Sequence, residues 1–177
     1  MRLQLYGSLE QFLEQVARRG SWVGGGSVAA LCAALAAALL EKLVIQPPAV
    51  RRLRVIRRQC LALVPQDAER FAKAIQATRR KDRGAFARAL KRATDVPCRV
   101  FRHAQTIEAA CRAAQRSVKP QFQSDLRCAM AVAMAAGESA RALIRTNLAW
   151  LNDPAYAKRI QQQLQHATSR DARTGLR

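Results

Sequence analysis

The sequence predicts an all-α protein, built as an antiparallel up-and-down bundle of helices. Apolar residues recur at helical spacing along every long segment, and no strand-like alternation occurs. Ala, Leu, Gln and Arg are abundant and only 5% of residues are aromatic, which disfavours a β-rich fold. Short breaks separate the segments, as in antiparallel neighbours. With 177 residues, we expect one helical domain over 1–167 and a disordered basic tail over 168–177.

The first two helices are predicted from caps and apolar spacing. Ser8 is a suitable N-cap for a first helix that ends at the Arg-Arg-Gly of residues 18–20. After a glycine-rich loop, Ser27 is expected to cap a second helix that runs to about Ile45. This helix is apolar on nearly all sides, so we expect it to be the buried centre of the bundle. Its apolar run over 28–40 is shorter than the roughly 20 residues of a membrane span.

Prolines and charged residues are expected to divide the middle of the chain. A proline lacks the backbone N–H and disfavours helix at the preceding residue, so breaks are expected at 46–48 and at Pro65. Residues 79–84 form a charged connector, and 94–97 mark a kink or restart. The amphipathic segments between these breaks are 49–64, 67–78, 86–93 and 98–117.

Two further helices are predicted in the last third of the chain. Ser124 or Asp125 heads a long helix with small and apolar residues in register to about residue 148. Asp153 as N-cap, followed by proline in the first turn, predicts a last helix that ends near His166.

The composition limits the partners and the cellular location that we expect for this protein. Lys and Arg total 31 against 12 Asp and Glu, a net charge of +19, and 25 of the 31 are Arg. Such a charge attracts polyanions; the alternative is solvated decoration of helix faces. Five cysteines without a CxxC pair, and no leader-like N-terminus, predict a cytoplasmic protein with inert thiols and no membrane partner. His103 and His166 form no ligand pattern, so we expect surface histidines and no metal.

The strongest local pattern is the glycine run at 24–26, directly before the second helix. Glycines at a helix N-terminus leave backbone N–H groups open at the positive end of the dipole, which suits an anion or a polarised oxygen. The pattern is neither a P-loop nor a dinucleotide fingerprint. The alternative is a flexible turn that lets two helices pack closely.

This pattern, GGGSVAAL at residues 24–31, resembles the PTPGGGS(V/A)AA motif of the cyclodeaminase/cyclohydrolase family. Further family-like motifs follow in the same order: Asp67 with Phe71, Ala-Thr-Asp-Val-Pro at 93–97, Ser124-Asp125, and Asn147 with Asn152-Asp153. The resemblance covers about residues 5–165. It departs at 44–52, where the family's lysine-rich segment has no counterpart.

The resemblance implies a helical bundle that forms homodimers, with a folate site at or near the subunit interface. It implies hydrolysis of 5,10-methenyltetrahydrofolate to the 10-formyl form, or cyclisation of 5-formiminotetrahydrofolate with loss of ammonia. A tetrahydrofolate derivative is then the substrate, and no metal or other cofactor is expected.

The same chemistry selects the candidate site residues. A carboxylate must manage water or an amine at the amidinium carbon, and Asp67 and Asp125 are the catalytic candidates. The alternative for each is an ordinary helix cap. The candidates for substrate binding are Gly24, Gly25, Gly26, Ser27, Asn147, Arg51 and Arg52. The two arginines fall where the family carries lysines, and a guanidinium is not equivalent to an ammonium.

Two other functions stay open. A divergent family member that lost catalysis would be a dimeric helical scaffold or binding module, as the missing lysine segment suggests. A less favoured alternative is nucleic-acid binding through the arginine face at 51–58 and the connector at 79–83.

Overall fold

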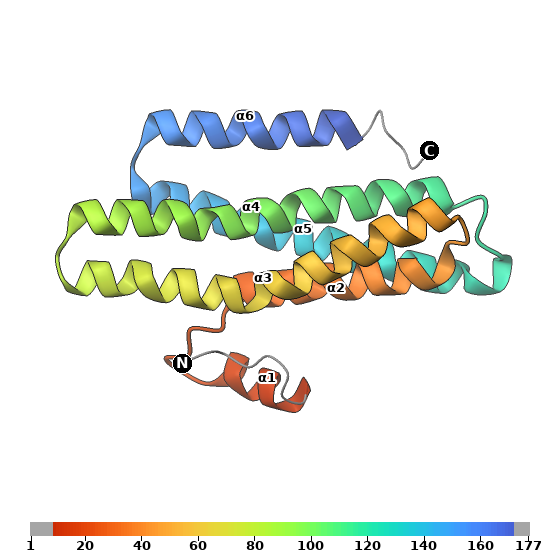
Figure 1. Cartoon of the computed structure of the whole chain (residues 1–177), viewed down its shortest axis with the longest axis horizontal. Helices are drawn as coiled ribbons and strands as arrows, with labels where there is room; N and C mark the ends of the chain where they lie inside the picture. The colour runs from red at the N-terminus through yellow and green to blue at the C-terminus, as the bar shows by residue number, and fades with distance from the viewer. Residues whose placement is uncertain (1–8, 172–177) are drawn as a thin grey trace.

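The computed structural model describes residues 9–171, with side chains to residue 165. Its elements are α1 (Leu9–Ala17), α2 (Gly25–Leu43), α3 (Pro47–Arg79), α4 (Arg83–Ala114), the 3₁₀ helix η1 (Pro120–Phe122), α5 (Gln123–Leu151) and α6 (Pro154–Asp171). No strand occurs within these limits. Helices α2 to α5 lie side by side in alternating directions, α6 lies along α4, and α1 lies on the opposite side of the bundle (Figure 1). The predicted all-α bundle is confirmed.

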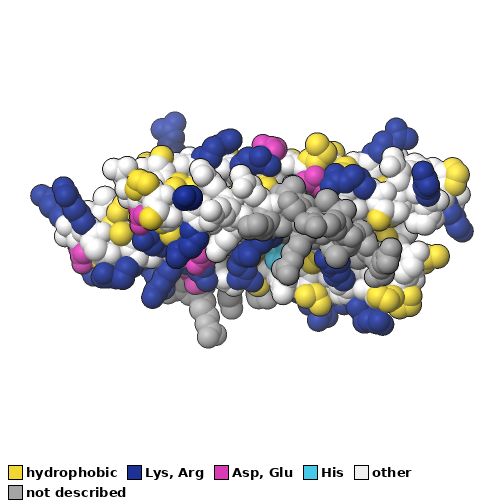
Figure 2. All heavy atoms as spheres, turned by 90° about the horizontal axis from the view of Figure 1, so that it is seen from above, with side chains coloured by type: hydrophobic (Ala, Val, Ile, Leu, Met, Phe, Trp, Pro, Cys, Tyr) yellow, Lys and Arg dark blue, Asp and Glu magenta, His cyan; other side chains and the backbone are white. Residues whose placement is uncertain are grey.

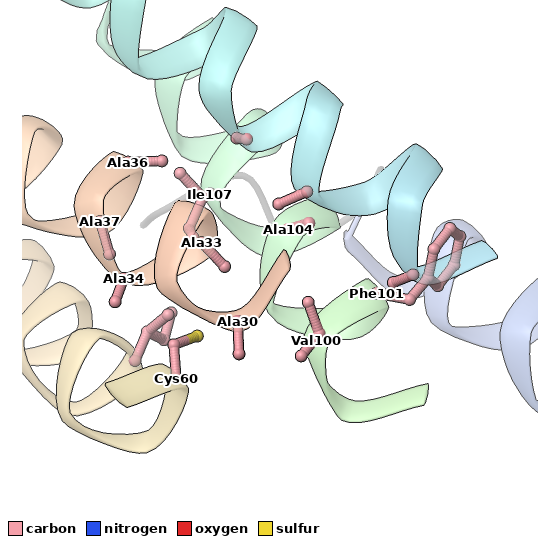
Figure 3. Close-up of a cluster of buried hydrophobic side chains, with 14 of the residues drawn as sticks. Ala30, Ala33, Ala34, Ala36, Ala37, Cys60, Val100, Phe101, Ala104 and Ile107 are labelled. Carbon is pink, nitrogen blue, oxygen red and sulfur yellow. The ribbon is translucent and has the colours of Figure 1, made fainter. Parts of the chain in front are cut away.

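Helix α2 forms the inner face of the core through its alanines. Ala30, Ala33 and Ala37 are fully buried, and Figure 3 shows this face directed toward Cys60 of α3 and Val100 of α4. Small side chains let the neighbouring helices approach closely, which is why α2 contacts α3, α4 and α5. Helix α2 is thus central, as predicted, but it is not buried on every side, because Leu35 on the outer face is 56% exposed.

Two predicted breaks do not occur. Helix α3 continues through Pro65, and α4 continues through Pro97. Each proline removes one intrahelical hydrogen bond at a cost of about 3 kcal/mol, but buried residues flank both positions. Packing of these flanks against the bundle offsets that cost, so each helix continues past its proline. The charged connector shrinks to residues 80–82, where Asp82 caps α4 by accepting a hydrogen bond from the Ala85 N–H at 2.8 Å.

The ends of the helices agree with the predictions in part. Asp153 caps α6 through the Tyr156 N–H at 3.0 Å, as expected. Helix α6 runs on to Asp171, beyond the predicted end, while residues 172–177 of the expected tail and the Ser8 cap lie outside the described residues.

Two features relate to the predicted cellular location, namely the burial of the cysteines and the apolar helix α2. Cys60, Cys98 and Cys111 are buried thiols, whereas Cys128 is exposed. Among the described helices, α2 alone is long and apolar enough to cross a membrane, which its shorter apolar run did not suggest. Half of that segment is buried inside the bundle.

Candidate functional site

The start of α2 is capped by a side chain from α3. Its N-cap residue, Gly24, has no side chain to offer, and Ser27 lies inside the helix instead of capping it. The Ser27 hydroxyl donates to the Val64 carbonyl at 3.0 Å and contacts Asp67 Oδ2 at 3.2 Å. The backbone N–H of Ser27 also donates to the Asp67 carboxylate. Asp67 therefore does the work of an N-cap for α2, from the middle of α3.

This position changes the acidity of the carboxyl group. Burial raises the pKa of Asp67 above its ordinary value of 3.8, and the two hydrogen bonds from Ser27 oppose that shift. The positive end of α2 also favours a negative charge here. A partly desolvated carboxylate with a raised pKa, held in one orientation, is suited to accept a proton.

The three glycines of the turn have different surroundings. A side chain on Gly26 would overlap the Asp67 carboxylate, so this position requires glycine. A Cβ on Gly25 would meet only the Leu143 side chain, at 3.7 Å, and one on Gly24 would meet nothing within 4 Å. Close packing of α2 on α3 thus explains Gly26 alone. At Gly24 and Gly25 the open N–H groups of the helix N-terminus remain available.

Helix α5 brings Asn147 to the same end of the bundle. Leu143 faces Gly25, and Asn147 and Trp150 follow at spacings of four and three residues on the same face. Asn147 is only 8% exposed, and its amide makes no hydrogen bond to another described residue. The Trp150 ring stacks on Phe71 of α3 with centroids 6.3 Å apart. An amide and an aromatic pair therefore lie beside the capped start of α2.

The remaining candidates lie at the other end of the bundle. Asp125, at the start of α5, accepts a hydrogen bond from Lys42 Nζ at 3.4 Å, and its side chain is 39% exposed. Lys42 is fifteen residues beyond Ser27 on α2, a rise of about 22 Å. Arg52 precedes Asp67 by the same number of residues on α3, and Arg51 by one more, so both are equally far away. The structure therefore divides the predicted site into two groups within one chain.

Near this second group, the end of α2 also carries an ion-pair cluster of Glu41, Arg54 and Arg57. Glu41 accepts hydrogen bonds from Arg57 Nε and Arg54 Nε, each at 2.9 Å. The hydrogen bonds and charges of these guanidinium groups hold the pKa of Glu41 below its ordinary value. Arg54 is thus engaged with α2, whereas Arg51, one of the two arginines that fall where the family carries lysines, is exposed.

His103 belongs to neither group. His103 is half-buried on α4, not on the surface as predicted, and burial together with Arg99 and Arg102 lowers its pKa to about 4. The side chain of His166 lies outside the described residues. Among residues that the structure describes, no three His, Cys, Asp or Glu side chains are grouped to hold a metal ion.

The sequence did not predict the Phe71–Trp150 pair, nor that Asp67 caps α2 instead of its own helix. The four-residue spacing of Asp67 and Phe71, and the three-residue spacing of Asn147 and Trp150, place each pair on one helix face. That signal was available, but only the packing of α3 against α5 shows that the two faces meet.

Comparisons with known sequences and structures both find cyclodeaminases. The sequence model of the formiminotransferase-cyclodeaminase family matches residues 8–46 and 47–166. The crystal structure of formiminotetrahydrofolate cyclodeaminase from Thermotoga maritima superposes with a TM-score of 0.84 at 23% sequence identity, covering 94% of this chain and 90% of that one. No curated protein matches this chain. At 23% identity, the similarity to this crystal structure shows that the two chains share a fold.

Proposed function

Because the chain belongs to the formiminotransferase-cyclodeaminase family, we propose that it is a cytoplasmic folate one-carbon enzyme. Its substrate is a tetrahydrofolate derivative, and its reaction is either hydrolysis of the 5,10-methenyl form or cyclisation of the 5-formimino form. The observation that carries this proposal is the Asp67 carboxylate, which sits partly buried on the N-terminus of α2 with a raised pKa.

Asp67 acts as the general base in the hydrolysis. Water adds to the amidinium carbon between N5 and N10, and its proton passes to the carboxylate. The bond from that carbon to N5 then breaks, which leaves the formyl group on N10 and a proton on N5. In the cyclisation, N10 adds to the formimino carbon and gives up its proton, and ammonia leaves with a proton gained. Each reaction requires one carboxylate that accepts or donates a proton on the atoms bonded to this carbon.

The groups around Asp67 suit the rest of the substrate. Ser27 is engaged with Asp67, so the N–H groups of Gly24 and Gly25 are the donors left at the start of α2 for a substrate oxygen. The amide of Asn147 supplies a further donor and acceptor. The exposed ring of Trp150 offers a flat surface on which a pterin can stack.

A homodimer joins the two separated groups of candidate residues. The outer side of α2 carries an apolar stripe, in which Leu35 is exposed and Val28, Leu31 and Leu39 are partly buried. A second copy packed on this stripe about a two-fold axis across the helix places the two α2 helices antiparallel. The start of one α2 then lies nearest the end of the other. In that arrangement the partner's Asp125, Arg51 and Arg52 complete the site around Asp67.

The test is turnover of the purified protein with both substrates. We expect loss of the methenyltetrahydrofolate absorbance above the buffer rate, or ammonia release from the formimino form. Asp67→Asn should lower kcat by about 100-fold or more, because general-base catalysis contributes about 10²–10⁴ in rate. Glu69→Gln, an exposed carboxylate two residues away, should leave kcat unchanged.

The opposite result selects the second candidate function. A dimer that neither turns over nor binds folate by calorimetry contradicts the enzyme. It indicates a scaffold that kept the bundle, in keeping with the absent lysine segment at 44–52.

A further inference from the structure

We propose that a groove between α3 and α4 binds the phosphate backbone of a nucleic acid, independently of the folate site. The groove has a volume of about 530 Å³, and two alanines, Ala85 and Ala89, leave its centre open. Its charged lining consists of Arg70, Lys73, Arg88, Arg92 and Asp95. None of these residues belongs to either group of the candidate folate site.

Four cations face one carboxylate in this groove, and only one of the cations is tied down. Arg70 donates from Nη1 to the Arg92 carbonyl at 3.0 Å and lies 4.0 Å from the Asp95 carboxylate. The side chains of Lys73, Arg88 and Arg92 are exposed and form no ion pair with another described residue. Arg70 thus bridges the two helices, while three charges stay available for an anion.

The positive charge continues beyond the groove to the tip of the α3–α4 hairpin. Arg80, Lys81 and Arg83 are exposed there, about ten residues or 15 Å along α3 from Arg70. Seen from the side of α6, Lys and Arg side chains lie at the left end of the molecule, where α3 connects to α4, as well as along the rest of this face (Figures 1 and 2). A single small anion cannot reach both the groove and the tip, whereas a chain of repeating charges can.

The chemistry of the surface favours phosphates over other anions. Three of the four groove cations are arginines, whose planar donors bind phosphate oxygens in pairs. The net charge of +19 attracts most strongly the polymer of highest charge density. No aromatic side chain lines the groove, so base stacking is absent there and the contact is to the backbone without sequence preference.

The test is fluorescence anisotropy of a labelled 20-nucleotide single-stranded RNA across a series of KCl concentrations. We expect log K to fall linearly with log salt for the parent protein. The double variant Arg88→Ala with Arg92→Ala should weaken binding at 0.1 M salt by about 10- to 30-fold. It should also make the slope shallower by about 1.4, since each single-strand phosphate contact contributes about 0.7.

A matched double variant separates the groove from net charge. Arg116→Ala with Arg127→Ala removes the same charge from exposed positions near the α4–α5 connection, and should leave the affinity within about threefold. Equal losses in both double variants, or no binding at 50 mM KCl, would overturn the proposal. So would displacement of the RNA by hexaglutamate at matched charge, which would assign the groove to a polycarboxylate. Folate turnover, measured in parallel, does not depend on any of these outcomes.

Discussion

At the scale of single residues, the most informative contact is the carboxylate of Asp67 on the first turn of α2. The contact requires that Gly26 carry no side chain and that Ser27 present both its N–H and its hydroxyl. One residue thus caps a helix and holds a proton acceptor near the surface. These two roles predict different consequences for stability and for activity.

Gly26→Ala should displace Asp67 and so reduce both properties. The added methyl group overlaps the carboxylate, and overpacking of this kind costs about 1–3 kcal/mol in the free energy of unfolding. Gly25→Ala, one residue earlier, meets only Leu143 at an ordinary distance and should stay within about 1 kcal/mol of the parent. Urea unfolding of both variants checks this. Equal stability of the two would contradict the contact.

Asp67→Asn should change stability in a pH-dependent way. The raised pKa means that the folded protein binds this proton more tightly than the unfolded chain does. The resulting stability is full below the ordinary pKa of 3.8 and is lost as pH rises through the raised value. The asparagine variant should therefore be more stable relative to the parent at pH 7 than at pH 4. Urea titrations of both proteins at both pH values measure this. A difference in the free energy of unfolding that does not change with pH would contradict the raised pKa of Asp67.

At the scale of elements, α2 is both a core helix and a surface helix. Its alanine face packs on α3, α4 and α5, while Leu35 on the other side is exposed and Leu31 and Leu39 are partly buried. Helix α3, which packs against α2, continues through Pro65 without a break. The outer stripe of α2 is the element that a second copy would cover.

Leu35→Glu should convert the proposed homodimer to a monomer. Leu35 is mostly exposed within one chain, so a charge there costs little in the monomer but is buried without a partner in the dimer. Light scattering should report half the mass, and circular dichroism should report unchanged helix. Met134→Gln, an equally exposed apolar residue on α5, is the control and should keep the parent mass. Dimers that survive Leu35→Glu would place the subunit contact elsewhere.

At the scale of the whole molecule, the two groups of candidate residues lie about 22 Å apart in one chain. The distance is bridged when the start of one α2 meets the end of the partner's α2. In the proposed homodimer, one chain would supply the general base and the other the cations.

Subunit complementation measures this sharing directly. Asp67→Asn and Asp125→Asn should each inactivate the homodimer. A heterodimer of the two, co-expressed with different tags and purified through both, contains one intact site of two and should recover about half of the parent activity. If the heterodimer stays as inactive as the single variants, each site lies within one chain.

The sequence by itself determined the helical class, most apolar stripes and the Asp153 cap, because helical periodicity and capping act over a few residues. It also singled out Gly26, Ser27 and Asp67, through family-like motifs. Only the tertiary structure decided that α3 and α4 pass through their prolines, since the cost of a proline is local while the packing that offsets it is not. It likewise decided which candidates meet. Asp67 reaches Ser27 from forty residues away, and Asp125 faces Lys42 at the far end, a separation that no local spacing encodes.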